Sequence, residues 1–438
     1  MDIVLRNAQI HNGPQVDIAI DGGKIAAIEP HLPAVGQNEI DAGGRLTIPA
    51  FVNGQLHACK SFWRRLLAQL PPEVQALSPF EAAAHVKRRY TPADIFARVD
   101  EVMQLAIRHG TCAIRLFADV DSDGGLAPVE GLLAIREKYA ALMAVQVVAF
   151  PQDGFAGDET ERLMRQALEM GADLVGGIPW IEAGTAAQQH HTERCFALAV
   201  EYDRDLHFVC DDTADPASRS LEMVARQTLT RGWQGRVTAT QCAALAFYDD
   251  DYANDVIRLV AEAGMTILSN SHVSLIATGF PERQPWPRSI TRVRELLDAG
   301  VPVACGQDDI DNWFYPFGRN DLLEVAQFMA HNGRFAWNGE VDRVLPMVTS
   351  TPARLLGLDD YGLHVGAAAN LLVLDAPDWH SAIQFQAEKR FVILRGRLVA
   401  ETQRVVKRSY SLDELLAGVT GGNLHGEVDS GPAVGKEI

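Results

Sequence analysis

The sequence predicts an α/β protein: a (β/α)8 TIM-type barrel with a small β-sandwich-like domain formed by both chain ends. In the middle of the chain, short apolar runs alternate eight times with longer amphipathic stretches, a pattern typical of parallel strands joined by helices. At both ends, short alternating segments are separated by glycine-containing turns, which is typical of antiparallel strands. We therefore expect the barrel over residues 50–356 and the small β-domain over residues 1–49 and 357–405.

The small β-domain is predicted from segments at both ends of the chain. Those at the N-terminal end are DIVLRNAQI, VDIAIDGGKIAAIEP and EIDAGGRLTIPA, and those at the C-terminal end are NLLVLDAPD and KRFVILRGRLVAE. Their similar alternation indicates that both ends contribute strands to one small domain. The last stretch is rich in glycine, so we expect residues 406–438 to be a tail with a short helix.

The barrel strands are predicted from the apolar runs. In chain order these are LTIPAFVNGQLH, CAIRLFADV, LMAVQVVAF, ADLVGGIP, LHFVCDD, RVTATQ, MTILSN and VPVACGQDD. Segments between them, such as PADIFARVDEVMQLAIRH and DDYANDVIRLVAEA, have the apolar spacing of amphipathic helices. An open doubly wound sheet is the alternative, but it needs a glycine-rich phosphate turn after an early strand, and the sequence has none there.

Composition narrows the classes of partner. The 438 residues carry a formal net charge of −18, with 47% hydrophobic and 22% charged residues. Such an acidic chain lacks the basic face that nucleic acid or an anionic membrane requires, and no apolar run reaches the ~18 residues of a spanning helix. The N-terminus has no signal-peptide pattern, and no cysteine pair has CxxC spacing. We therefore expect a cytoplasmic protein without nucleic-acid or membrane partners.

Polar side chains close most of the predicted barrel strands. The carboxyl ends of barrel strands converge on one cavity, where carboxylates, amides and imidazoles form a ligand-shaped pocket. A single such residue is often only a helix cap or a turn residue, but several strand ends together favour a functional pocket. The residues concerned are Gln55, His57, Asp119, Gln152, Asp211, Asp212, Gln241, His272, Gln307, Asp308, Asp309 and Trp313.

Three local motifs resemble those of the amidohydrolase superfamily, in its cytosine deaminase branch. They are VVAFPQDGF, CDDTADPASR and GQDDIDNWFYPFG. The resemblance implies a metal-dependent barrel that hydrolytically deaminates a cyclic amidine. It places Gln152 against the substrate ring and Asp212 at the position of the catalytic glutamate. It also places Asp308 at the position of the aspartate that binds the metal and accepts a proton.

The sequence departs from that family at the metal positions. The family's first strand carries His-x-His, whereas this chain has Gln55-x-His57. Other family histidines are replaced at Phe117, Val209, Gln241 and Gln307. Since a catalytic metal uses three or more protein ligands and only His57 and Asp308 remain, we expect no cofactor. A weak or unconventional divalent metal at His57 and Asp308 is left open.

Glutamine at three of the replaced positions favours a repurposed pocket over an abandoned one, because a buried unpaired amide costs ~1–3 kcal/mol. We predict a hydrolase that acts on a C–N bond of a small nitrogen heterocycle, either a cyclic amidine, amide or imide. The alternatives are a metal-free lyase or isomerase and a catalytically silent ligand-binding homologue. The family resemblance implies a homo-oligomer.

The predicted catalytic residues are Asp308, Asp212 and His57. The predicted substrate-binding residues are Gln55, Gln152, Asp211, Gln241, Gln307, Asp309 and Trp313. Lys60, on the loop after the first barrel strand, is expected in solvent or paired with a carboxylate.

Overall fold

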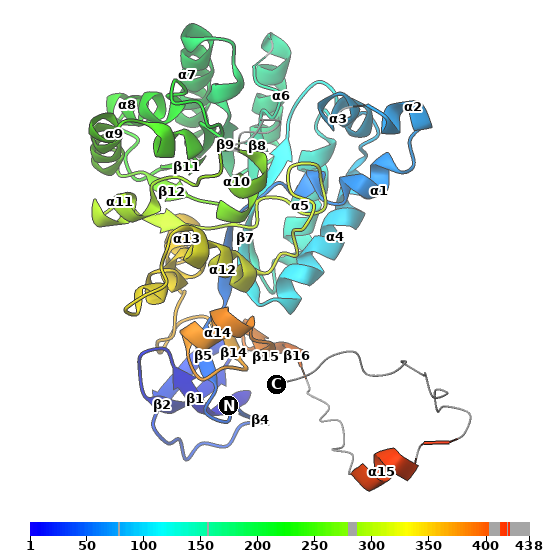
Figure 1. Cartoon of the computed structure of the whole chain (residues 1–438), viewed down its shortest axis with the longest axis vertical. Helices are drawn as coiled ribbons and strands as arrows, with labels where there is room; N and C mark the ends of the chain where they lie inside the picture. Colours follow the sequence, from blue (N-terminus) through cyan, green and yellow to red (C-terminus); the bar gives the residue numbers. More distant parts are fainter. Residues whose placement is uncertain (78, 156, 279–286, 403–411, 418, 421–438) are drawn as a thin grey trace, which may run out of the picture. The chain divides into compact units, whose positions relative to one another are not determined.

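The computed structural model describes residues 1–77, 79–155, 157–278, 287–402, 412–417 and 419–420 (Figure 1). The chain divides into two units, residues 1–402 and 403–438. In the second unit the structure describes helix α15 (Leu412–Ala417) and the two residues 419 and 420. The rest of the predicted tail, and residues 403–405 of the predicted β-domain, lie outside the described residues.

Eight parallel strands follow one another around a barrel in chain order. The hydrogen-bonded order runs from β13 back to β6, and a parallel bridge between Leu56 and Asp308 joins its two ends. The strands are β6 (Phe51–Leu56), β7 (Thr111–Asp119), β8 (Ala144–Phe150), β9 (Leu174–Gly177), β10 (Asp205–Cys210), β11 (Val237–Gln241), β12 (Thr266–Leu268) and β13 (Val303–Ala304).

Helices connect the barrel strands. They are α4 (Pro92–Arg108), α5 (Ala127–Tyr139), α6 (Asp158–Glu169), α7 (Thr185–Tyr202), α8 (Ser220–Arg231), α9 (Asp250–Glu262), α10 (Ser271–Ala277) and α11 (Val293–Asp298). Helices α12 (Leu322–Asn332) and α13 (Ser350–Leu355) follow the last barrel strand. Between β6 and α4 the chain forms a short 3-10 turn, η1 (Ala58–Lys60), and three further helices. These are α1 (Trp63–Leu67), α2 (Pro72–Gln75) and α3 (Pro79–Lys87).

Helix α4 illustrates how the sequence forms these elements. Thr91 caps its N-terminus by accepting the Asp94 N–H, and Pro92 occupies the first turn, where no N–H is needed. Its apolar face is buried through Ile95, Val99, Val102, Met103 and Ala106.

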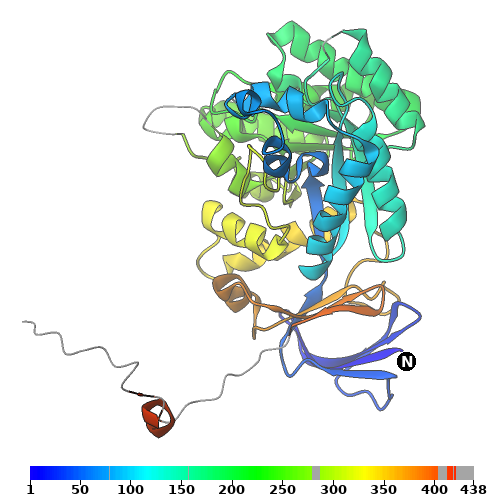
Figure 2. The same cartoon turned by 90° about the vertical axis from the view of Figure 1, so that its right-hand side faces the viewer.

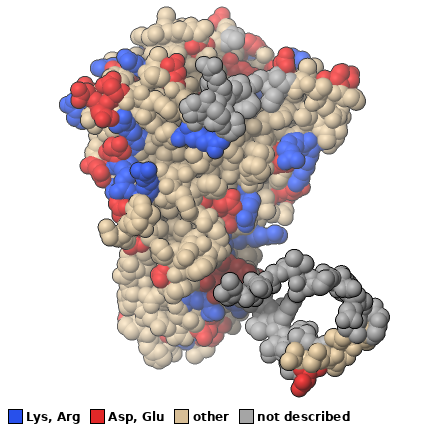
Figure 3. Space-filling model, viewed as in Figure 1, with Lys and Arg blue, Asp and Glu red and all other residues tan. Residues whose placement is uncertain are grey.

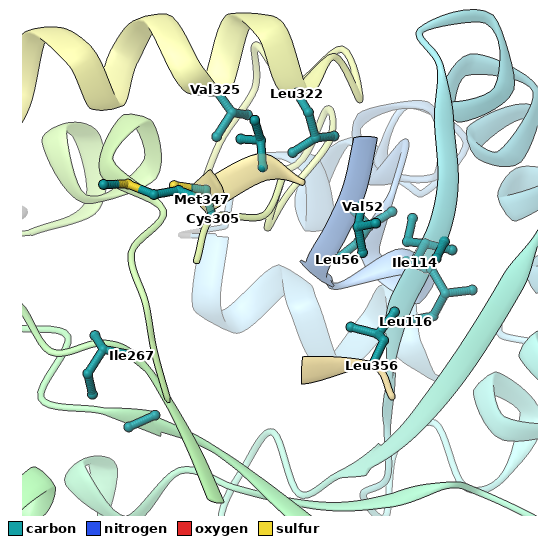
Figure 4. Close-up of a cluster of buried hydrophobic side chains, with 14 of the residues drawn as sticks. Val52, Leu56, Ile114, Leu116, Ile267, Cys305, Leu322, Val325, Met347 and Leu356 are labelled. Carbon is teal, nitrogen blue, oxygen red and sulfur yellow. The ribbon is translucent and has the colours of Figure 1, made fainter. Parts of the chain in front are cut away.

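The barrel strands pack their outward side chains against the helices. Figure 4 shows Val52 and Leu56 of β6 and Ile114 and Leu116 of β7 in the core. The same cluster contains Leu322 and Val325 of α12, so α12 is held against the strand pair that leads to the site.

Both chain ends form a second sheet, as Figure 2 shows by its blue and orange strands. Its order is β16-β15-β14-β5-β1-β2-β3, with β4 paired to β1. Strand β5 ends at Pro49 and β6 begins at Phe51, so the chain passes from one sheet to the other at Ala50. The strands are β1 (Ile3–Ile10), β2 (Gln15–Asp21), β3 (Lys24–Glu29), β4 (Asn38–Asp41), β5 (Leu46–Pro49), β14 (Leu371–Leu374), β15 (Lys389–Leu394) and β16 (Arg397–Glu401). Helix α14 (Trp379–Phe385) lies between β14 and β15 in the chain.

The predicted fold class, a (β/α)8 barrel with a second β-structure from the chain ends, is confirmed. Among the described residues, no helix is both long and apolar enough to cross a membrane. On the face shown in Figure 3, lysine and arginine side chains are interspersed with aspartate and glutamate.

Candidate active site

The candidate site lies where the barrel closes, at the carboxyl ends of its strands. The Asp308 backbone N–H donates to the Gln55 carbonyl oxygen at 2.9 Å, and the His57 N–H donates to the Asp308 carbonyl oxygen at 2.7 Å. These backbone bonds bring Gln55, His57 and Asp308 together, although 253 positions separate Gln55 from Asp308 in the sequence.

Two glutamine amides hold the carboxylate of Asp308, and we call Gln55 and Gln241 the amide clamp. Gln55 Nε2 donates to Oδ1 of Asp308 at 2.9 Å, and Gln241 Nε2 donates to Oδ2 at 2.5 Å. Asn270 Nδ2 donates to Oε1 of Gln55 at 3.2 Å, and Ser274 Oγ donates to Oε1 of Gln241 at 3.0 Å. Because each amide oxygen has its own donor, the amide NH2 groups are the ones left to face the carboxylate.

The backbone at these strand ends adopts the left-handed region, which is unusual for residues with a side chain. The φ angles are +64° at Asp308, +65° at Gln241 and +47° at Asp211. Such conformations cost ~1–3 kcal/mol and persist where the surrounding contacts impose them. The hydrogen bonds of the amide clamp and of the closing bridge are contacts of this kind, so the positions of these side chains are firmly set.

His57 is a buried, neutral imidazole with one free nitrogen. Burial lowers its pKa well below the usual value, and the nearby positive charge of Lys60 lowers it further. The ring packs against Phe117 and Phe150, with centroids 4.8 and 5.2 Å away. Nε2 lies 3.6 Å from Oδ1 of Asp308, and Nδ1 has no hydrogen-bond partner. Nδ1 of His57 can therefore accept or donate one further hydrogen bond.

The residues present do not fit the divalent metal that the family resemblance implies. Both oxygens of Asp308 accept hydrogen bonds from the amide clamp, whose NH2 groups are donors and not metal ligands. Phe117 and Val209, which replace two of the family's histidines, belong to an apolar cluster with Phe150. Within the part of the chain that the structure describes, no group of three or more His, Cys, Asp or Glu is placed to hold a metal ion.

Lys60 enters the site, which corrects the expectation of a solvent-exposed side chain. Lys60 is 2% exposed. Its Nζ lies 3.7 Å from Oδ1 of Asp119, which agrees with the alternative expectation that Lys60 pairs with a carboxylate. Nζ also donates to Oε1 of Gln152 and lies 5.3 Å from the centroid of the Phe314 ring. Lys60 is the last residue of the turn η1, and all three residues of this turn are buried.

Asp119 is a site residue that was named among the polar strand ends but left out of the predicted catalytic and substrate-binding residues. It is 1% exposed, and neither carboxylate oxygen has a hydrogen-bond partner. Burial raises its pKa, and the positive charges of Lys60 and Lys87 oppose that rise. Its position at the end of the second predicted barrel strand was the sequence signal that pointed to it.

Asp212 and Asp309 are further acidic groups at the site. Burial and the negative charge of Asp309 raise the pKa of Asp212 to about 7, and Oδ1 of Asp212 has no hydrogen-bond partner. Burial also raises the pKa of Asp309, which accepts a hydrogen bond from Asn312 Nδ2 at 2.5 Å. For Asp308, burial and the charges of Asp309 and Asp212 raise the pKa well above the usual value.

The other three predicted substrate-binding residues, Asp211, Gln307 and Trp313, also have protein partners in the structure. Oδ1 of Asp211 accepts from the Ser220 backbone N–H and hydroxyl, each at 2.7 Å, so this carboxylate fixes the start of α8. Gln307 Nε2 donates to the Asp309 carbonyl oxygen at 3.3 Å. The ring of Trp313 packs edge-on against Trp63, with centroids 4.8 Å apart.

Comparison with known proteins places this barrel in a family. Residues 38–402 match the model described as "Amidohydrolase family". The chain belongs to the amidohydrolase family. This confirms the predicted family and the predicted class of enzyme, a hydrolase of C–N bonds.

Several relatives match over most of their length. The N-isopropylammelide isopropyl amidohydrolase of Pseudomonas sp. (strain ADP) is 31% identical to this amidohydrolase, covering 92% of this chain and 98% of that protein. The pterin deaminase of Rhizobium rhizogenes is 28% identical over 88% of each chain. The crystal structure of the 5-methylcytosine deaminase from Klebsiella pneumoniae, liganded with 5-fluorocytosine, superposes with a TM-score of 0.85 at 31% identity. It covers 93% of this chain and 99% of that one.

Proposed function

We propose that this amidohydrolase cleaves the bond between a ring carbon and an exocyclic nitrogen of a small nitrogen heterocycle, without a resident metal. The names of the relatives, an amidohydrolase of N-isopropylammelide and deaminases of pterin and 5-methylcytosine, support the reaction class and the kind of ring. The amide clamp is the observation that supports the absence of a resident metal, because its neutral N–H donors occupy both oxygens of Asp308.

Asp308 is the proposed general base. Its carboxylate is buried, and the two amide N–H donors favour its ionised form. Its raised pKa makes that form a stronger base than an exposed aspartate. In the proposed step it takes a proton from a water molecule that adds to the ring carbon. His57 positions that water or the ring through its free Nδ1.

Asp212 is the proposed general acid. A carboxyl group with a pKa of about 7 is half protonated at neutral pH, so it can donate a proton to the leaving nitrogen. Its Oδ1 has no protein partner and is free to face that nitrogen.

Lys60 and Gln152 form the proposed ring-binding side of the pocket. Because Nζ of Lys60 donates to the amide oxygen of Gln152, the NH2 group of Gln152 is left to donate to a ring acceptor. Asp309 and Trp313 complete the proposed substrate contacts. Gln307 and Asp211 act in this proposal as positioning residues, since their side chains bond to the protein.

Two proposals concern the setting of the enzyme. A cytoplasmic location is supported by the cysteines, since all six are free and buried in the structure. Assembly into a homo-oligomer rests on the family resemblance, and sedimentation of the purified protein tests it.

The reaction is tested with a panel of amino- and alkylamino-substituted pyrimidines, pteridines and triazines. We expect release of ammonia or amine, with oxygen from 18O-labelled water entering the ring product. A product of unchanged mass would instead indicate an isomerase, and elimination without water oxygen would indicate a lyase. Tight binding without any turnover across the panel would indicate a silent ligand-binding homologue.

The metal-free part of the proposal is tested by restoring the family's ligands. The triple variant Gln55→His, Val209→His, Gln241→His places three imidazoles beside His57 and Asp308, enough for a zinc site. After dialysis against zinc, we expect about one equivalent in this variant and far less in the parent chain, by mass spectrometry of the metal. The parent's turnover should survive a chelator. A stoichiometric metal in the parent, or loss of its turnover with the chelator, would contradict the proposal.

A further inference from the structure

A cavity of about 300 Å³ lies at the amino ends of the barrel strands, opposite the candidate site. Its wall includes Asp205 and Thr266, the first residues of β10 and β12, and Pro302, which directly precedes β13. Pockets that take small molecules have volumes of about 300–1,000 Å³, so this cavity suits a small ligand. The candidate site lies at the carboxyl ends of the same strands, and none of its described residues lines this cavity.

Three arginines bring positive charge to this cavity. Arg115, Arg236 and Arg354 line it, and Asp205 is the one carboxylate among its described lining residues. Oδ1 of Asp205 already accepts from Nε of Arg236 at 2.6 Å, and Arg236 also pairs with Asp203 at 2.6 Å. Arg115 and Arg354 therefore contribute two positive charges that no carboxylate of the described wall pairs with. Such a cavity stands out in a chain whose formal net charge is −18.

Arg115 of β7 is buried, and its hydrogen-bond partners are neutral groups. The residue is 1% exposed. Nε and Nη2 donate to Oε1 of Gln146 at 3.0 and 2.9 Å, and Nη2 also donates to the Leu355 carbonyl oxygen at 2.9 Å. Nη1 lies 3.2 Å from Nδ1 of His207. A guanidinium has five N–H donors, so these four contacts leave one N–H of Nη1 for a further acceptor. Because buried charges are usually paired, an anion is the favoured acceptor.

Two carboxylates act on Arg115 through their charge, and both are engaged with other arginines. Burial lowers the pKa of Arg115 to about 10, and the charges of Asp205 and Asp173 oppose this fall. Arg115 therefore remains a cation at neutral pH. Asp205 pairs with Arg236, as described above, and Asp173 pairs with Arg136 at 2.9 Å. An added anion in the cavity would thus be the direct partner of the Arg115 guanidinium.

Further donors complete the wall of the cavity. Arg354 lies in the last turn of α13, directly before Leu355, whose carbonyl oxygen Arg115 holds. Arg354 is exposed and forms no ion pair within the described residues. Threonine hydroxyls also line the cavity, from Thr351 of α13 and from Thr238 and Thr266, which are paired across β11 and β12. Arginine guanidiniums and hydroxyl groups are donors that bind phosphate oxygens in proteins.

We propose that this cavity binds a phosphate group, either as inorganic phosphate or on a small phosphorylated molecule. At neutral pH such a group carries a charge of ~−1.5 to −2, which matches the two guanidiniums that lack a carboxylate partner. One phosphate oxygen would accept the remaining N–H of Arg115, and Arg354 and the threonine hydroxyls would hold the others. The bound group would link the end of α13 to β7 and β11, and because it binds the folded chain, it would raise the Tm. This inference is independent of the proposed function, because these residues take no part in that chemistry.

Calorimetric titration of the whole chain tests the inference with two probes, inorganic phosphate and ribose 5-phosphate. We expect saturable binding of at least one probe and a higher Tm in its presence than in sodium chloride of equal ionic strength. Tighter binding of ribose 5-phosphate would assign the cavity to phosphorylated molecules, and tighter binding of inorganic phosphate would assign it to the free ion. No saturable binding of either probe, or an equal rise in Tm with sodium chloride, would overturn the inference.

Variants place the bound phosphate in this cavity. Arg354→Gln should weaken binding of the tighter probe by about tenfold, the loss expected for one hydrogen bond to a charged group. Arg115→Met should weaken it further, and circular dichroism shows whether that variant is folded. Because Arg354 is exposed, its variant decides the question even where the loss of the buried Arg115 prevents folding. Arg397→Gln is the matched control, since Arg397 is exposed on β16 of the second sheet and does not line this cavity. Unchanged affinity of Arg354→Gln, or an equal loss of affinity in Arg397→Gln, would overturn the inference.

Discussion

The carboxylate of Asp308 accepts one amide hydrogen bond on each oxygen, and this limits what the residue can do. The amide N–H donors orient this carboxylate and favour its ionised form. Burial and the charges of Asp309 and Asp212 act the other way and raise its pKa well above the usual value, although the charge of Lys60 lowers it. A fixed, strongly basic carboxylate at the mouth of the barrel is suited to proton abstraction.

The variant Asp308→Asn tests this role. We expect kcat/KM to fall by about 10²–10⁴-fold, the usual contribution of a positioned general base. The new NH2 group would face an NH2 group of the amide clamp, so the free energy of unfolding should also fall by ~1–3 kcal/mol. Thermal unfolding of the variant shows whether it is folded at the assay temperature. Full turnover by the folded variant would remove Asp308 from the mechanism.

The raised pKa of Asp212 predicts that the stability of the folded chain depends on pH. Its pKa rises from the usual 3.8 to about 7 in the folded chain, so unfolding releases a proton between these values and the folded state is progressively destabilised as the pH rises through them. Replacement by asparagine removes this effect. The difference in Tm between Asp212→Asn and the parent should therefore grow from about pH 4 to about pH 7 and then level off. The exposed Asp215→Asn serves as control, and a difference that is independent of pH would contradict the assignment.

At the scale of elements, α10 orients the amide clamp from its first turns. Ser274 of α10 donates to Gln241, and Asn270 directly before the helix donates to Gln55. Removing the Ser274 hydroxyl leaves the Gln241 amide free to rotate its oxygen towards Asp308, which would repel the carboxylate. We expect Ser274→Ala to lower kcat by about tenfold with a smaller effect on KM, because positioning and not binding is lost.

Ser289→Ala provides a comparison for this variant, since among the described residues that hydroxyl donates to the neighbouring Ile290 carbonyl oxygen. Steady-state kinetics of both variants separates the two cases. If Ser274→Ala and Ser289→Ala behave alike, the orientation of the amide clamp does not depend on α10.

The elements also show what the sequence can and cannot predict. The apolar runs located all eight barrel strands, and their last residues named the members of the amide clamp, because strand ends in a barrel meet at one mouth. The direction of the two amides could not be predicted, since it depends on donors from α10 that lie far away in the sequence. The burial of Lys60 was missed for a related reason: Lys60 lies in a three-residue 3-10 turn, and periodicity over so short a segment carries no signal.

At the scale of the whole molecule, the barrel and the second sheet are joined where α4 meets β7. Gly110 lies there with a φ of +85°, and its carbonyl oxygen accepts the Phe51 N–H at 2.9 Å. A Cβ at this position would collide with the side chain of Leu372 in β14 of the second sheet. The close approach of the backbone to Leu372 therefore requires glycine.

Gly110→Ala should destabilise the fold without altering the chemistry. The collision with Leu372 adds ~1–3 kcal/mol of overpacking to the ~1–2 kcal/mol that a left-handed alanine costs. Gly232→Ala isolates the second contribution, because Gly232 has a φ of +68° and nothing lies within 4 Å of its added Cβ. The free energy of unfolding measured in urea should therefore be highest for the parent, lower for Gly232→Ala and lowest for Gly110→Ala. Since the site lies at the opposite ends of the strands, kcat/KM of both folded variants should match the parent. A fall in kcat/KM for Gly110→Ala alone would mean that the second sheet also sets the geometry of the pocket.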